Sequence, residues 1–216
     1  SRGFIYFAAK IMIKFLKYVL ILTTILFEAE LAKANDYERA YEALAAEDYK
    51  TAVYYLSFFA SNGDARSQYN MGIIYRDGLG YEENSSAALA WFLLAAEQKH
   101  VLANYAAGLL LRDGPVDVQQ PERAVHYLKE ASFLGHALAP LEIGNMYFLG
   151  NHVQKDRALA FVWWSLSAER NAPGAQANIA ALTDSLSVEE MTEIQNILKS
   201  CDVQPLRKCL RKPIIQ

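Results

Sequence analysis

The chain repeats an Arg-Asp-Gly triplet whose residue types could serve phosphate binding or acid–base chemistry. The first copy lies in "RDGLG" at residues 76–80 and the second in "RDG" at residues 112–114. A phosphate-binding loop follows a strand, whereas both copies follow a helical pattern of apolar residues. No nucleophile or general base accompanies either copy, and neighbouring Arg and Asp side chains usually form a solvated ion pair. We therefore interpret the triplets as helix ends without a catalytic role.

Four histidines are the other residues that could bind a metal or transfer a proton. His100 and His136 are 36 residues apart in expected turns, where a polar side chain needs no further role, and His126 and His152 occupy other positions of the pattern. A zinc site draws several side chains to within about 2.0–2.1 Å of one ion. The spacing does not predict such a convergence, so we expect no metal and no cofactor.

Residues 1–34 have the pattern of a secretory signal peptide. Lys14 and Lys17 precede ten uncharged residues, "YVLILTTILF", and Ala32 and Ala34 follow in A-x-A spacing. This pattern predicts cleavage after Ala34 and export to the periplasm or the medium. The apolar run is shorter than the about 20 residues that span a bilayer, so we expect no stable membrane insertion after cleavage. The alternative is an N-terminal anchor that is not cleaved.

Removal of the signal peptide would leave an acidic chain. Residues 1–34 hold five of the 21 Lys and Arg and two of the 24 Asp and Glu residues, which leaves 16 basic and 22 acidic residues and a net charge of −6. Nucleic-acid binding requires clustered Lys and Arg to neutralise phosphates. We therefore expect no nucleic-acid partner.

Both cysteines lie in the C-terminal tail, at Cys201 and Cys209. An exported chain enters an oxidising compartment, where a disulfide between them is expected. The alternatives are two free thiols or a metal site, although two ligands do not complete a tetrahedral zinc site.

A period of 36 residues organises the chain. Such a period indicates a repeat architecture, in which each unit buries its apolar face against its neighbours. The recurring positions are Gly72, Gly108 and Gly144; Gly78, Gly114 and Gly150; Ala88, Ala124 and Ala160; and Trp91, Tyr127 and Trp163.

Each unit reads as two helices. The first covers about 13 residues, such as 65–77, and ends at a glycine that we expect in the left-handed conformation. The second begins after Asn84, Gln120 or Asp156, which are typical helix starts.

A glycine inside the first helix, such as Gly72, costs about 1 kcal/mol relative to alanine. We expect it to allow a neighbouring helix to approach, with the aromatic side chains at Tyr75 and Trp91 filling the space.

Three stretches carry a family resemblance: "YNMGIIYRDG…AALAWFLLAA", "YAAGLLLRDG…AVHYLKEAS" and "LEIGNMYFLG…ALAFVWWSLSA". They resemble the Sel-one-like repeat family, a relative of the tetratricopeptide repeat. The resemblance implies an all-α fold, a right-handed α-α superhelix built as a solenoid of helix hairpins. After the repeats, "SVEE" at residues 187–190 is a capping box that predicts a C-terminal capping helix.

The 216 residues suffice for one ordinary domain with terminal extensions. We divide the chain into an N-terminal extension and signal peptide at 1–34; a repeat solenoid at 35–184, with units at about 36–63, 64–100, 101–136 and 137–172 and a partial unit at 173–184; and a capping helix with a basic, cysteine-containing tail at 185–216.

The resemblance also implies that the first helices of successive units line a concave surface that binds a protein or peptide. The alternative is that these positions are merely solvated or serve packing. The expected binding residues are Arg66, Asn70, Ile73, Arg76, Asp77, Leu102, Leu109, Arg112, Asp113, Leu138, Glu142, Asn145 and Phe148.

These observations predict a non-catalytic protein-binding scaffold or adaptor of the cell envelope or exported space. One alternative is a β-lactamase-like or cell-wall-acting enzyme, although the chain has no S-x-x-K motif and no cysteine pair in each repeat. Another is a membrane-tethered assembly factor that keeps its signal segment.

Overall fold

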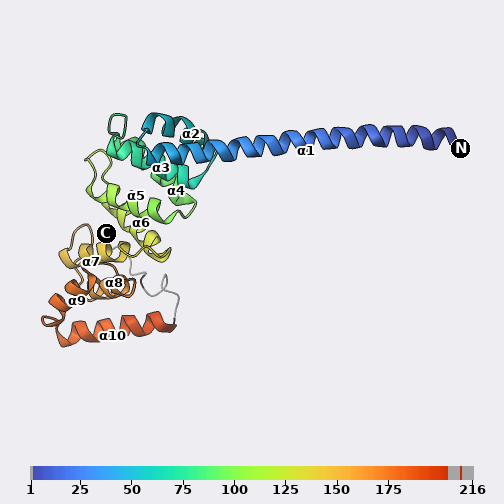
Figure 1. Cartoon of the computed structure of the whole chain (residues 1–216). Coiled ribbons are helices and arrows are strands. Elements are labelled where there is room, and N and C mark those ends of the chain that lie inside the picture. Colours follow the sequence, from blue (N-terminus) through green and yellow to red (C-terminus); the bar gives the residue numbers. More distant parts are fainter. Residues whose placement is uncertain (1, 204–209, 211–216) are drawn as a thin grey trace. The chain divides into compact units, whose positions relative to one another are not determined.

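The computed structural model describes residues 2–203 and 210, and every element among them is an α-helix (Figure 1). The helices are α1 (Arg2–Ala45), α2 (Tyr49–Ser61), α3 (Ala65–Asp77), α4 (Ser85–Glu97), α5 (Val101–Asp113), α6 (Pro121–Phe133), α7 (Ala139–Leu149), α8 (Arg157–Glu169), α9 (Ala175–Thr183) and α10 (Val188–Val203). The chain forms two compact units, residues 1–59 and 60–216.

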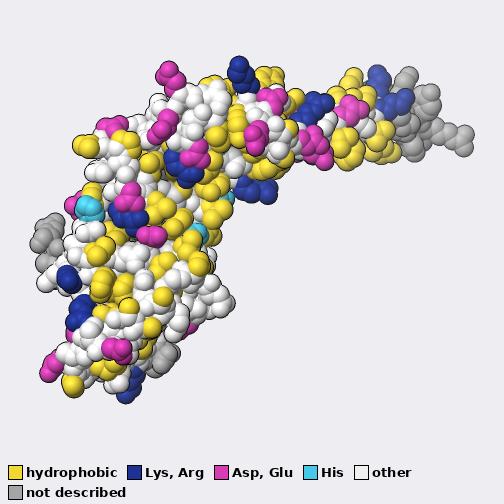
Figure 2. Space-filling view, turned by 60° about the vertical axis from the view of Figure 1, so that its left-hand side comes forward, with side chains coloured by type: hydrophobic (Ala, Val, Ile, Leu, Met, Phe, Trp, Pro, Cys, Tyr) yellow, Lys and Arg dark blue, Asp and Glu magenta, His cyan; other side chains and the backbone are white. Residues whose placement is uncertain are grey.

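The first unit contains α1 and most of α2. The end of α1 packs on α2, where the rings of Tyr37 and Phe59 meet edge to face with centroids 5.0 Å apart. Before this contact, large apolar side chains are exposed along α1 between Met12 and Leu31, and Figure 2 shows them on the surface of that helix. The helix continues without a break through Ala34, the expected cleavage site. No helix of the described residues meets the length and apolarity that crossing a membrane requires.

The second unit consists of helix hairpins that contact their neighbours along the chain. We call α3, α5, α7 and α9 the A helices and α4, α6 and α8 the B helices. Each B helix packs against the A helix before it and the A helix after it, and α10 packs against α8. The A and B helices alternate because each has one apolar stripe, which is buried only between two neighbours.

The glycines inside the A helices lie where a B helix crosses closely. A Cβ atom on Gly72 would come within 2.5 Å of the Phe92 ring, and one on Gly108 within 2.7 Å of Leu128 Cγ. Gly144 faces Trp164 in the same way. The expected close approach is therefore confirmed.

The side chains that fill this space differ from those expected. They stand at positions 92, 128 and 164, one residue after the aromatic positions 91, 127 and 163. Phe92 is fully buried, whereas Trp91 and Tyr127 are only partly buried; Trp163 is fully buried too, but the ring that faces Gly144 is that of Trp164. A helix turns by about 100° per residue, so a shift of one residue changes which helix a side chain faces.

The glycines that end the A helices do not share one conformation. Gly78 and Gly150 are left-handed, with φ of 62° and 78°, as expected. The expectation was wrong for Gly114, which is extended at φ −66° and ψ −179°. Pro115 follows it, and a residue before proline is restricted to extended conformations.

The helix starts follow the sequence signals in most cases. The Asn84 side chain accepts a hydrogen bond from the Ala87 N–H at 2.8 Å, and Asp156 accepts one from Leu159 at 2.8 Å. Gln120 makes no such bond, and Pro121 begins that helix. The capping box is reciprocal: the Ser187 N–H donates to Glu190 Oε2 and the Glu190 N–H donates to Ser187 Oγ.

The turns from one hairpin to the next share one backbone conformation. Gly63, Lys99, Gly135 and Asn171 stand 36 residues apart, and all have positive φ angles between 56° and 99°. The next residue in two of these turns is a histidine whose Nδ1 caps the following A helix: His100 accepts from the Ala103 N–H and His136 from the Ala139 N–H, each at 3.2 Å.

Candidate functional site

The expected binding residues lie on α3, α5 and α7 or directly before α7, and none of them is fully buried. We call the surface formed by the A helices the A-helix face. Within it, the structure brings together one group from two neighbouring repeats: Arg112 and Asp113 of α5 with Glu142, Asn145 and Phe148 of α7. The residues on α3, together with Leu102, Leu109 and Leu138, line neither of the two hollows described below.

An ion-pair network joins α5 to α7 on this face. Arg112 binds Asp113 at 2.6 Å and reaches Glu142 Oε2 of α7 at 2.8 Å. Burial works to lower the pKa of Arg112, but the hydrogen bonds to both carboxylates outweigh it and raise the pKa. Arg112 is therefore a fixed cation, and two carboxylates surround it.

The equivalent pair one repeat earlier is simpler. Arg76 binds Asp77 at 2.6 Å, and both side chains are more than a third exposed. The hydrogen bond from Arg76 lowers the pKa of Asp77. Arg76 and Asp77 therefore form the solvated ion pair that we expected. Arg112 differs, because its side chain is only 17% exposed and also pairs with Glu142 of the next repeat.

A polar hollow lies on the α5 side of α7. Its volume is about 260 Å³. It is lined by Arg112, Asp113, Glu142, Asn145, Met146, Leu149, Asn151 and His152. Glu142, Asn145, Met146 and Leu149 have the i, i+3, i+4, i+7 spacing of one helix face, so α7 supplies its wall.

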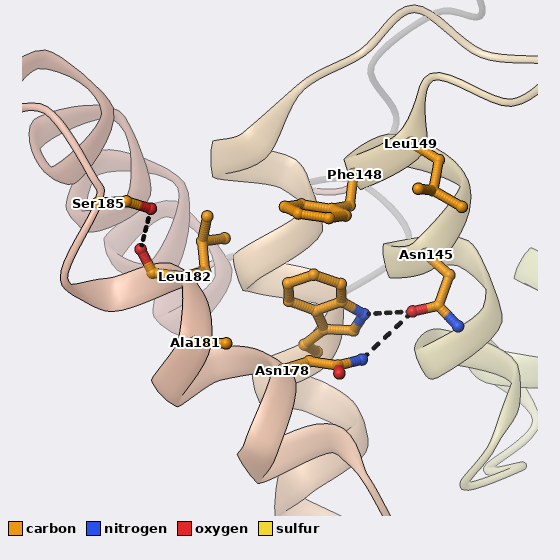
Figure 3. A pocket seen from close by; sticks show the side chains of 8 residues that line it. Asn145, Phe148, Leu149, Asn178, Ala181, Leu182 and Ser185 are labelled. Atoms are coloured by element: carbon orange, nitrogen blue, oxygen red, sulfur yellow. Dashed lines mark hydrogen bonds between the residues drawn. The ribbon is translucent and has the colours of Figure 1, made fainter.

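An apolar hollow of about 310 Å³ lies on the α9 side of α7 (Figure 3). It is lined by Asn145, Phe148, Leu149, Trp164, Asn178, Ala181, Leu182 and Ser185. The Phe148 and Trp164 rings pack at 5.3 Å between centroids, and the Lys155 ammonium lies 5.9 Å from the Phe148 ring.

Asn145 stands on the ridge between the two hollows. Its side-chain oxygen accepts hydrogen bonds from Trp164 Nε1 at 3.1 Å and from Asn178 Nδ2 at 3.3 Å (Figure 3). Both bonds use the oxygen, so the side chain is held in one orientation. Its amide nitrogen donates no hydrogen bond within the described residues.

The sequence interpretation missed the α8 and α9 side of the apolar hollow. Asn178 and Ala181 follow Glu142 and Asn145 by 36 residues, so extension of the period into residues 173–184 would have found them. Trp164 carried no such signal. Its equivalents in the two preceding repeats, Phe92 and Leu128, are both fully buried. The period therefore predicts a buried side chain at position 164 and gives no sign that it lines a hollow.

Of the four histidines in the sequence analysis, His152 lines the polar hollow of this face. In the part of the chain that the structure describes, no three His, Cys, Asp or Glu side chains form a group that could hold a metal ion. Cys201 lies in α10, and Cys209 is outside the described residues, so the disulfide stays a prediction.

Comparison with known protein families assigns the repeats. The Sel1 repeat model matches residues 43–64, 65–100, 101–136 and 137–171. The chain belongs to the Sel1 repeat family. This confirms the resemblance to Sel-one-like repeats that the sequence indicated.

Solved structures show the same fold. A Sel1 repeat protein from Oxalobacter formigenes is 29% identical, with a TM-score of 0.62 over 67% of this chain and 60% of that one. A protective antigen of uropathogenic Escherichia coli with the SLR fold is 23% identical, with a TM-score of 0.66 over 69% of this chain and 33% of that one. The expected all-α superhelix of helix hairpins is therefore confirmed.

Two curated proteins are similar to part of this chain. DAP3-binding cell death enhancer 1 from Mus musculus is 32% identical over 58% of this chain and 25% of its own length. Chitin synthase regulatory factor 2 from Schizosaccharomyces pombe is 29% identical over 59% of this chain and 27% of its own length. The chain thus spans about a quarter of the length of either relative.

Proposed function

We propose that this Sel1 repeat chain is a non-catalytic scaffold that binds a protein or peptide on its A-helix face. The ridge of Asn145 carries the proposal, because an amide donor that makes no hydrogen bond within the described residues stands between an apolar and a polar hollow. Ligand sites in proteins usually combine such an apolar wall with a few fixed polar groups. The name of the mouse relative, which states that it binds another protein, agrees with a binding role.

A pull-down with the purified protein tests the proposal. Arg76→Glu and Arg112→Glu reverse a charge on the A-helix face, and Arg123→Glu reverses an exposed charge at the start of the B helix α6. We expect at least one partner from a cell-envelope extract to be lost with the A-helix-face variants and kept with Arg123→Glu. Circular dichroism and thermal unfolding check that each variant is folded. If every partner stays bound to both A-helix-face variants, this face is not the binding surface.

We also propose that the chain is exported and that residues 1–34 are removed. The exposed apolar side chains of α1 between Met12 and Leu31 support this, because such a surface is stable in a signal-recognition groove or a bilayer and not in water. Mass spectrometry of the protein from fractionated cells should give Asn35 as the first residue and place it outside the cytoplasm. A retained N-terminal segment in the membrane fraction would favour a membrane-tethered factor instead.

A further inference from the structure

The two hollows of the A-helix face lie on opposite sides of one helix. α7 separates them, and Asn145 and Leu149 belong to the walls of both. A ligand that fills both must therefore cross α7 at this ridge. A peptide in the extended polyproline II conformation can do so, because residues three apart project from the same face of its narrow backbone.

The apolar hollow selects an uncharged side chain. Phe148, Trp164, Leu149 and Leu182 supply most of its wall, and the Lys155 ammonium stands beside the Phe148 ring. A cavity of about 310 Å³ admits one large apolar side chain. A basic side chain is disfavoured there, since it would lose water and the lining residues offer no carboxylate to pair with it.

The polar hollow selects a basic side chain. Its fixed charges are the guanidinium of Arg112 and the carboxylates of Asp113 and Glu142, which leaves one negative charge in excess. Arg112 donates a hydrogen bond to Glu142 Oε2, whereas Glu142 Oε1 accepts no hydrogen bond within the described residues. Asp113 is 60% exposed, so both carboxylates can accept a further donor from Lys or Arg.

The ridge between the hollows suits a peptide backbone. Trp164 and Asn178 hold the oxygen of Asn145, so its amide nitrogen is oriented before any ligand arrives. A backbone carbonyl that crosses the ridge can accept this donor, and no side chain of the peptide is needed.

The width of α7 sets the spacing. A helix with its side chains is about 10–12 Å across, and a polyproline II chain advances about 3.1 Å per residue with three residues per turn. Side chains in the two hollows are thus about three residues apart.

We propose that α7 is the recognition element for an extended peptide with a large apolar side chain and a Lys or Arg three residues from it. The apolar side chain fills the Trp164 hollow, the basic side chain pairs with Glu142 and Asp113, and Asn145 donates to the backbone between them. This inference rests on the proposed binding function and names the class of partner.

Fluorescent peptides test it on the full chain. The probe is an acetylated and amidated octapeptide, Gly-Ser-Leu-Ser-Ser-Lys-Ser-Gly, together with its reversed order. Companion peptides replace Lys by Glu, replace Leu by Ser, or place one or five residues between Leu and Lys. By fluorescence anisotropy we expect one of the two orders to bind, and each change to weaken binding about tenfold, as the loss of a charge-assisted hydrogen bond or a buried side chain gives.

Variants of the protein assign the binding to the two hollows. Ala181→Leu fills the apolar hollow and should weaken binding of the probe about tenfold. Ala180 is exposed on the same helix but outside the hollow, so Ala180→Leu should leave binding of the probe unchanged. Asp113→Asn should weaken binding of the Lys peptide and leave binding of the companion with Glu in place of Lys unchanged. The control is Glu122→Gln, which neutralises an exposed carboxylate at the start of the B helix α6 and should leave binding unchanged.

Three results would overturn the inference: no binding of either probe order at millimolar concentration, equal binding of the Lys and Glu peptides, or equal binding to the Ala181→Leu protein. If these occur while a pull-down partner is still lost on Arg112→Glu, the A-helix face binds proteins but with another specificity. The two proposals therefore fail separately.

Discussion

At the scale of single residues, the hydroxyl groups of Ser67 and Ser132 are buried and make no hydrogen bond within the described residues. Ser67 gives the clearer comparison, because the equivalent positions 103, 139 and 175 are buried alanines. An unsatisfied buried hydroxyl costs about 1–3 kcal/mol. We expect Ser67→Ala to raise the free energy of unfolding by about 1 kcal/mol, measured by urea denaturation.

The reverse change in the next repeat is the matched control. Ala103→Ser places a hydroxyl in the same surroundings, and we expect it to lower the free energy of unfolding by about 1–3 kcal/mol. A stabilising Ala103→Ser would show that the site can solvate or bond a hydroxyl, against the argument for Ser67.

The glycines inside the A helices provide the second prediction at this scale. In Gly108→Ala the new Cβ would meet Leu128 side-chain atoms at 2.7–2.9 Å and its backbone nitrogen at 3.1 Å. Overpacking lowers the free energy of unfolding by about 1–3 kcal/mol, and the better helix propensity of alanine offsets about 1 kcal/mol of this. We expect a net loss of stability in urea denaturation.

Position 180 is the control, because it has the same register and an exposed alanine. There Ala180→Gly removes a methyl group and should lower stability by about 1 kcal/mol, through helix propensity alone. If Gly108→Ala were stabilising, the close approach of α6 to α5 would not depend on this glycine.

At the scale of elements, the turns between hairpins show what a non-glycine residue costs at a position with a left-handed backbone. Lys99 has φ 62° where the neighbouring repeats have Gly63 and Gly135. The left-handed conformation costs a residue with a Cβ about 1–2 kcal/mol, and the greater unfolded-state entropy of glycine offsets about half of this. Lys99→Gly should raise the free energy of unfolding by about 0.5–1 kcal/mol, and Gly135→Lys should lower it.

The same turns contain a pH-sensitive cap. Burial lowers the pKa of His100, where Asp64 opposes and Arg66 assists the shift, and burial with Arg170 lowers the pKa of His136. Nδ1 can cap the helix only when it is unprotonated. Because the folded pKa lies below the unfolded one, the stabilisation is complete above about pH 6.5 and is lost as the pH falls through the lowered folded pKa.

His100→Asp tests this cap. Asp64 occupies the equivalent position one repeat earlier and caps α3 through its carboxylate, at 2.7 Å from the Ser67 nitrogen. Urea denaturation at about pH 7.5 and pH 5.5 measures how much the free energy of unfolding falls between the two values. We expect this fall to be smaller for His100→Asp than for the parent chain. An equal loss would assign the acid sensitivity to other groups.

The elements themselves were largely predictable from the sequence, and their contacts were not. Residues 65–77 were expected as a helix and α3 has these bounds, because the Gly78 stop and the preceding Asp64 cap are local signals. The conformation of Gly114 and the partner of Gly72 depend on Pro115 and on the rotation of α4 about its axis. The apolar hollow is built from three helices, so the family resemblance, which selected Asn145 and Phe148 on the first helices of the repeats, did not lead to Trp164 on α8.

At the scale of the whole molecule, the second unit is held together by contacts between neighbouring helices. The contacts run from α3 to α9 in chain order, and α10 adds a contact with α8. In such an array each repeat is stabilised by its own packing and by its interfaces with its neighbours. A change at one end should therefore weaken the nearest repeat more than a distant one.

Ile194 tests this with a change in the capping helix. It is 2% exposed and belongs to the apolar cluster that contains Trp163 and Trp164. Ile194→Ala should cost about 2–5 kcal/mol, since the cavity left behind loses its contacts. By hydrogen exchange, we expect amide protection to fall in α8 and α9 and to stay nearly unchanged in α3 and α4. An equal fall in all helices would mean that the hairpins unfold as one cooperative unit, and the cap would then stabilise the polar and apolar hollows and the distant repeats alike.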